Sequence, residues 1–146
     1  MAQIAKLETK AEITNPPAKV YDFLKYNINK FVNLFPQVFK SFKLIEGEEG
    51  HSGNVKIVEY VIGKAMTAKV KTEELNDEER SMIMRVVEGE ILQLYPTFLC
   101  KISVSDGCMN WSIQFEKTSD STPKPDAYVQ VLAHVTKLMD LYLLTS

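Results

Sequence analysis

The C-terminal segment of the chain follows a different pattern from everything before it, and this contrast constrains the fold. Between residues 38 and 117, six short segments alternate apolar and polar side chains, as strands with one buried face do. Residues 123–144 instead repeat apolar side chains every three or four positions, which predicts one long amphipathic helix. Because the links between the strand segments are short and turn-like, we expect antiparallel neighbours.

A further strand and a helical region precede these elements. Residues 4–13 alternate like a strand, and Asn15-Pro16-Pro17 then supplies a helix cap and prolines suited to a first turn. Helical spacing continues to Pro36, which predicts one or two short helices between Pro16 and Phe35. The expected strands cover residues 4–13, 38–46, 54–62, 66–76, 80–88, 95–105 and 108–117.

These elements predict a single α+β domain over residues 1–146. A seven-stranded antiparallel sheet has to cover its apolar face, and the long C-terminal helix is the only sizeable candidate. We therefore expect a curved sheet that grips this helix, with two short helices between strands 1 and 2 closing one end.

One turn fixes the register of the last two strands. Asp106-Gly107 is the two-residue signal of a type I′ hairpin, and it pairs Ser105 with Cys108. Cys100 then lies opposite Ile113, and the apolar side chains of both strands share one face. At about 3.3 Å per residue, the Cα atoms of the two cysteines are roughly 16 Å apart. A disulfide needs less than about 7 Å, so we expect two free thiols.

Composition and charge argue against several classes of protein. With 17 Lys+Arg against 19 Asp+Glu and a net charge of −2, the chain lacks the basic face of a nucleic-acid binder. It has no run of 18 apolar residues to span a membrane, and no apolar signal segment at the N-terminus, so we expect a cytoplasmic location. Two cysteines and two distant histidines predict no metal site, and no motif predicts a cofactor.

The apolar face of the sheet favours a cavity. It is rich in Met, aromatic and Cys side chains, and a curved sheet around one helix encloses more volume than these side chains readily fill. A filled core is the alternative, and it is our interpretation of the cluster Phe31, Phe35, Phe39 and Phe42. The residues expected to contact a ligand are Met82, Met84, Tyr95, Phe98, Cys100, Ile102, Trp111, Ile113, Leu132, Val135, Met139 and Tyr142.

A glycine-spaced loop links two strands through Gly47, Gly50 and Gly53. It is similar to a phosphate loop, but it leads into a strand and offers no helix N-terminus to an anion. Its carboxylates, which include Glu48 and Glu49, would repel phosphate. We interpret it as a structural loop at the rim of the cavity.

Candidate catalytic groups are sparse. His51 and His134 are expected to face solvent, so no hydrolytic triad is assigned. Glu88, Glu90 and Tyr95 lie where a strand ends near the expected cavity mouth, and a desolvated carboxylate beside a tyrosine could perform acid–base chemistry. The alternative is a rim that hydrogen-bonds solvent or ligand.

Several stretches resemble the major latex protein family, within the plant Bet v 1 and pathogenesis-related class 10 superfamily of START-like proteins. They are MAQIAKLE at 1–8, NLFP at 33–36, VEGEILQLY at 87–95, WSIQFEK at 111–117 and LYLL at 141–144. The resemblance implies a helix-grip fold with an internal cavity for a hydrophobic small molecule such as a plant hormone, sterol or secondary metabolite. It also implies a cytosolic plant protein linked to defence, stress or development.

Function within the superfamily stays open between classes. Norcoclaurine synthase needs a lysine in its last strand, where this chain has Trp111, so that activity is not expected. A non-enzymatic carrier is favoured over an isomerase or lyase of specialised metabolism, and a hormone receptor is a third possibility. Lys56 matches a position that is commonly basic in the superfamily; its alternative interpretation is a surface ion-pair partner. We expect a monomer or a weak dimer.

Overall fold

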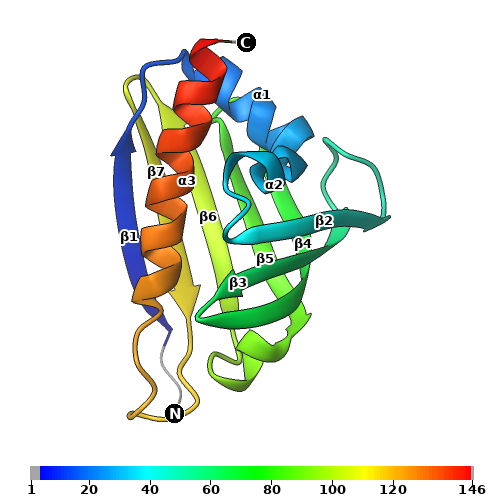
Figure 1. The fold of residues 1–146 in the computed structure, drawn as a ribbon, viewed down its shortest axis with the longest axis vertical. Coiled ribbons are helices and arrows are strands. Elements are labelled where there is room, and N and C mark those ends of the chain that lie inside the picture. The colour runs from blue at the N-terminus through cyan, green and yellow to red at the C-terminus, as the bar shows by residue number, and fades with distance from the viewer. Residues whose placement is uncertain (1–3, 146) are drawn as a thin grey trace.

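The computed structural model describes residues 4–145 and confirms the α+β architecture. Seven strands form one antiparallel sheet in the order β1-β7-β6-β5-β4-β3-β2, and α3 lies across its concave face (Figure 1). The short helices α1 and α2 follow β1 and contact α3. The elements are β1 (Ala5–Glu12), α1 (Pro17–Asn27), η1 (Ile28–Lys30), α2 (Phe31–Leu34), β2 (Phe39–Glu46), β3 (Val55–Ile62), β4 (Lys64–Asn76), β5 (Ser81–Gly89), η2 (Glu90–Gln93), β6 (Phe98–Ser105), β7 (Cys108–Phe115) and α3 (Asp126–Leu144).

The predicted register of the β6–β7 hairpin is confirmed. Ser105 pairs with Cys108, Ile102 with Trp111, and Cys100 with Ile113. Both cysteines are free thiols. Burial raises the pKa of Cys100 to about 12, so its thiol is protonated at neutral pH.

Two connections begin or end differently from the expectation. β6 starts at Phe98 and not at residue 95, because the short 3-10 helix η2 and the following turn occupy the connection from β5. Helix α3 starts at Asp126 and not at residue 123, with Pro125 as the residue before its first turn. Tyr95 Oη donates a hydrogen bond of 2.6 Å to the carbonyl of Pro123, which ties these two segments together.

The sheet is bent where the pairing register of neighbouring strands shifts. Register shifts occur between β2 and β3 and between β4 and β5, and such bulges increase local twist and curvature. The sheet curves around α3 (Figure 1).

The apolar interior consists of two packed clusters. One surrounds Val135 and Met139 of α3, both completely buried, and includes residues of α1 such as Val20. The other lies toward the opposite end of β6 and β7 and includes Ile91 and Phe115, each 1% exposed. Packing of α3 against the sheet is therefore tight in some places, and the space between the clusters decides where a cavity can lie.

A buried carboxylate fastens the loop between β1 and α1 to helix α3. Asp140 accepts hydrogen bonds from the backbone N–H groups of Thr14 and Asn15, at 2.9 and 3.1 Å, and from both of their side chains. Asn15 Nδ2 also donates to the Asp140 carbonyl at 2.7 Å. Burial alone would raise the pKa of Asp140, but the hydrogen bonds from Asn15 and Thr14 outweigh it and hold the pKa below its ordinary value.

Removing this carboxylate should destabilise the protein strongly. Asp140→Ala leaves the buried backbone N–H of Asn15 and the partly buried N–H and hydroxyl of Thr14 without this acceptor, so we expect a loss of about 3 kcal/mol in the free energy of unfolding. Because the folded-state pKa is the lower one, the contribution of Asp140 is present above the unfolded value of about 4 and is lost as pH falls through the folded value. Urea unfolding from neutral to acidic pH measures both effects. Asp120→Ala, at an exposed carboxylate, is the control. An equal, small effect of the two substitutions would contradict this role.

Candidate functional site

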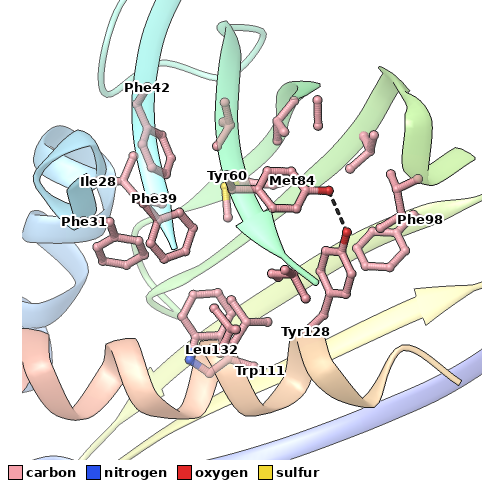
Figure 2. A pocket seen from close by; sticks show the side chains of 17 residues that line it. Ile28, Phe31, Phe39, Phe42, Tyr60, Met84, Phe98, Trp111, Tyr128 and Leu132 are labelled. Carbon is pink, nitrogen blue, oxygen red and sulfur yellow. Dashed lines mark hydrogen bonds between the residues drawn. The ribbon is translucent and has the colours of Figure 1, made fainter. Parts of the chain in front are cut away.

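An apolar cavity lies between the concave face of the sheet, helix α3 and the short helices (Figure 2). Its volume is about 140 Å³, and an adjoining lobe of about 130 Å³ shares most of its wall. An engineered apolar cavity of about 150 Å³ binds benzene, so the main cavity alone is large enough for one aromatic ring, and a larger ligand also has to occupy the adjoining lobe. The wall consists of Ile28, Phe31, Phe39, Phe42, Val58, Tyr60, Ile62, Ala68, Val70, Met84, Val86, Ile91, Phe98, Trp111, Tyr128, Val131 and Leu132.

Alternation and helical spacing place these side chains. On β3, Val58, Tyr60 and Ile62 occupy every second position and face inward, opposite the helix. On α3, Tyr128 and Leu132 are four residues apart and therefore lie on one face of the helix. Residues of both packed clusters line the cavity, because it lies in the gap between them.

The phenylalanine cluster has a second role. Phe31, Phe39 and Phe42 contact one another, with ring centroids 5.5–6.3 Å apart, as core aromatics do. Their other side forms one end of the cavity wall (Figure 2). The interpretation of these residues as filled core is therefore incomplete, because the sequence pattern shows burial but not what a buried ring faces.

Two tyrosines supply the hydroxyl groups of the wall. Tyr60 Oη and Tyr128 Oη are 2.6 Å apart and share a hydrogen bond across the cavity (Figure 2). Tyr128 Oη also lies 3.6 Å from the sulfur of Met66. Burial raises the pKa of both tyrosines, so both hydroxyls are uncharged at neutral pH.

The other polar atom of the wall is already engaged. Trp111 Nε1 donates to Thr136 Oγ1 at 2.7 Å, and Thr136 Oγ1 donates to the Leu132 carbonyl at 2.7 Å. Because Trp111 and Thr136 are almost completely buried, this chain fixes the indole against α3. The indole therefore presents its apolar ring to the cavity.

The structure distributes the predicted ligand-contact residues over several places. Met84, Phe98, Trp111 and Leu132 lie on the main cavity wall, and Cys100 and Ile113 lie on the adjoining lobe. Ligand contact by any of them stays a prediction. The remaining six lie elsewhere: Met82, Ile102, Val135 and Met139 in the packed cluster, Tyr142 in a surface depression beside α1, and Tyr95 in an outer groove.

Sequence reasoning missed the tyrosine pair as a site. Tyr128 belongs to the apolar stripe of the predicted helix, and Tyr60 has the same parity as Val58, so both signals indicated inward-facing side chains. Their pairing could not be predicted from local patterns, because Tyr60 and Tyr128 are 68 residues apart in the sequence.

Residues 2–146 match the Pathogenesis-related protein Bet v 1 family. The chain belongs to this family. MLP-like protein 423 of Arabidopsis thaliana is 28% identical over 94% of this chain and 93% of the relative. Major latex protein 146 of Papaver somniferum is 29% identical over 98% and 93%. These relatives confirm the resemblance to major latex proteins. The chain spans 47% of another relative, the Arabidopsis thaliana MLP-like protein 34, at 28% identity.

Solved structures agree on the fold of this Bet v 1 family chain. Ginseng major latex-like protein 151 from Panax ginseng superposes with a TM-score of 0.91 at 27% identity, covering 97% of this chain and 98% of that one. Norcoclaurine synthase from Thalictrum flavum, in complex with dopamine and hydroxybenzaldehyde, reaches 0.83 at 15% identity, covering 99% and 88%. At that identity, the similarity to the synthase shows a shared fold alone.

The acid–base candidates do not form a pair facing the cavity of this Bet v 1 family chain. Glu88 is exposed and forms an ion pair of 3.0 Å with Lys69. The Tyr95 hydroxyl donates to Pro123. Within residues 4–145, no cluster of three His, Cys, Asp or Glu side chains could hold a metal ion, and no helix is long and apolar enough to cross a membrane.

The glycine loop between β2 and β3 is held by internal contacts. Gly47, Gly50 and Gly53 all adopt positive φ. A Cβ on Gly50 would overlap the ring of Tyr26 on α1, so the glycine lets this ring pack on the loop. Asn54 Nδ2 donates to the His51 carbonyl at 2.8 Å, and the exposed His51 lies 3.5 Å from Glu48.

Lys56 is paired, but not at the surface. Its Nζ lies 3.1 Å from Glu49 Oε1 in the glycine loop, and its side chain is only 10% exposed. It has the same inward parity on β3 as Val58, and its cross-strand partner Val70 lines the cavity. Lys56 therefore forms an ion pair, as the alternative interpretation holds, but its side chain is buried and does not lie at the surface. Alternation, not charge, decides which face of the sheet a strand residue occupies.

Alanine at two of these glycines separates backbone strain from the Tyr26 contact. Gly53→Ala incurs the positive-φ penalty alone, about 1 kcal/mol, since nothing lies within 4 Å of its Cβ position. Gly50→Ala should cost more, because it also displaces Tyr26. Chemical unfolding measures both changes. In a Tyr26→Ala background the excess should disappear; if it persists, or if Gly50→Ala costs no more than Gly53→Ala, the packing role is contradicted.

Proposed function

We propose that this protein binds or carries a hydrophobic small molecule in its internal cavity, without transforming it. The observation that carries the proposal is the cavity wall, which combines aliphatic and aromatic surface with two uncharged hydroxyls. Ligand pockets typically have this composition: a mostly apolar wall and a few polar groups that fix orientation. A plant hormone, a sterol or a secondary metabolite has matching chemistry.

An outer groove supports an access route for the ligand. This groove has a volume of about 460 Å³ and lies at the N-terminal end of α3, beside the turn between β3 and β4. Ile62, Ile91 and Tyr128 line both the groove and the inner cavity. A ligand that passes between them enters at the hydroxyl end of the cavity, where Tyr128 would have to move.

An isomerase or lyase acting in the same cavity is the second candidate, since norcoclaurine synthase has this fold. The wall supports it less well: the described wall residues include no carboxylate, histidine or lysine to move a proton. Mass spectrometry of a bound ligand recovered unchanged supports a carrier. A changed mass, dependent on the protein, supports the enzyme.

The family relationship supports a wider setting for the carrier. We place the protein in the cytoplasm, with a role in defence, stress response or development, as a monomer or a weak dimer with no nucleic-acid partner and no cofactor. The named major latex protein relatives and the net charge of −2 favour this setting.

Filling the cavity should weaken binding without unfolding the protein. Ala68 is 3% exposed and lies on the cavity wall, whereas Ala65 on the same strand faces solvent. Because the added side chain of Ala68→Leu occupies ligand volume, we expect it to weaken binding of the uncharged dye Nile red at least about tenfold. Quenching of Trp111, the single tryptophan, measures the titration. Ala65→Leu should bind as the unmodified protein does; equal binding by Ala68→Leu would overturn the cavity as the site.

A further inference from the structure

The tyrosine pair lies on the cavity wall and has hydrogen-bonding capacity that its own contacts leave unused; in this structure the hydroxyls face each other, so the pair has to open to reach a ligand oxygen. Each hydroxyl carries one donor and two acceptor lone pairs. One O–H is used between Tyr60 and Tyr128 at 2.6 Å, and the other has only the Met66 sulfur, at 3.6 Å, which is a weak acceptor. When a ligand oxygen opens the Tyr60–Tyr128 contact, the pair can give it one hydrogen bond and accept one from it, at one place in an otherwise apolar wall (Figure 2).

The positive charge nearest to the wall on β3 is neutralised. Lys56 faces inward two residues before Val58, but Glu49 Oε1 holds its Nζ at 3.1 Å. The second oxygen, Glu49 Oε2, is buried and has no hydrogen-bond partner among the described residues. An anionic ligand that reached Lys56 would therefore meet this carboxylate, and the described wall residues of the cavity and its lobe include no Lys, Arg or His.

We propose that the cavity selects an uncharged apolar ligand with one hydrogen-bonding oxygen, such as a hydroxyl, ester or ketone group, and rejects carboxylates. The Tyr60–Tyr128 pair takes the oxygen, and Glu49 determines specificity by keeping Lys56 occupied. This inference rests on the proposed function, because it names the chemical class of the ligand for the same cavity.

The physical reason is the difference in desolvation. A hydroxyl or carbonyl group that leaves water loses hydrogen bonds to water but regains one from the tyrosines. The net gain is small, about two- to tenfold in affinity. A carboxylate that leaves water needs a cation or several donors, and an unpaired buried charge is far more costly. The cavity wall offers it one tyrosine pair and no Lys, Arg or His, and Lys56 beyond the wall is already bound to Glu49.

Four probes with one ring system test the selectivity: naphthalene, 2-naphthol, methyl 2-naphthoate and 2-naphthoate. Their affinities are measured by displacement of Nile red at neutral pH. We expect methyl 2-naphthoate to bind at least about tenfold more tightly than 2-naphthoate, since the ester keeps the oxygen without the charge. Equal affinity of the ester and the carboxylate would overturn the proposal, and this comparison needs no variant.

Variants then separate the two parts of the proposal. Removing both hydroxyls in Tyr60→Phe/Tyr128→Phe should weaken 2-naphthol and the ester about two- to tenfold and leave naphthalene unchanged. Glu49→Gln frees Lys56, so 2-naphthoate should gain at least about tenfold while the ester does not change. Adding Lys56→Gln to Glu49→Gln should cancel that gain. Glu48→Gln, at an exposed carboxylate of the same loop, is the control.

The outcomes distinguish this inference from the proposed function. If Nile red and all four probes fail to bind, the carrier function itself is wrong. If Nile red and naphthalene bind, but the phenylalanine variant leaves 2-naphthol unchanged or Glu49→Gln leaves 2-naphthoate unchanged, the carrier stands and the corresponding selectivity role is overturned. Circular dichroism and thermal melting show that each variant is folded.

Discussion

One helix has to cover the apolar face of a seven-stranded sheet, and that face is larger than one helix can cover. The structure depends on this difference in size. Helix α3 has 19 residues and packs against β1 and β7, with Val135 and Met139 completely buried in one of the two clusters. The bulged ladders of β2–β3 and β4–β5 curve the rest of the sheet away from a flat contact. Part of the inward-facing apolar surface is therefore left uncovered by α3. The cavity between the two clusters lies there.

Polar groups decide what this apolar space can hold. Where α3 meets the sheet, Trp111 and Thr136 satisfy each other, so that contact is closed to a ligand oxygen. Elsewhere on the cavity wall, Tyr60 and Tyr128 satisfy each other only in part. At the glycine loop, the charges of Lys56 and Glu49 neutralise each other. The interior therefore has one place with spare hydrogen-bonding capacity and no free charge among the wall residues, which is why an uncharged ligand fits it best.

Local patterns in the sequence were sufficient for most of the fold. The Asp106-Gly107 turn set the β6–β7 register because turn chemistry and alternation act over a few residues. The stripe on residues 123–144 predicted α3 for the same reason. The cavity wall was predicted only in part. Alternation shows that Met82 and Met84 both face inward, but not that α3 and α1 cover the first and leave the second on the cavity. That difference depends on where the helices cross the sheet, which is a tertiary property.

A crystal structure of the complex with 2-naphthol tests the ligand selectivity of the cavity most directly. We expect the naphthalene rings between Trp111 and the β3 and β5 walls, with the naphthol oxygen within about 3 Å of Tyr60 Oη or Tyr128 Oη, the length of an ordinary hydrogen bond. A ligand whose oxygen points toward Phe31 and away from the tyrosines would contradict the selectivity. A cavity that stays empty, with the ligand on the surface, would contradict the carrier function.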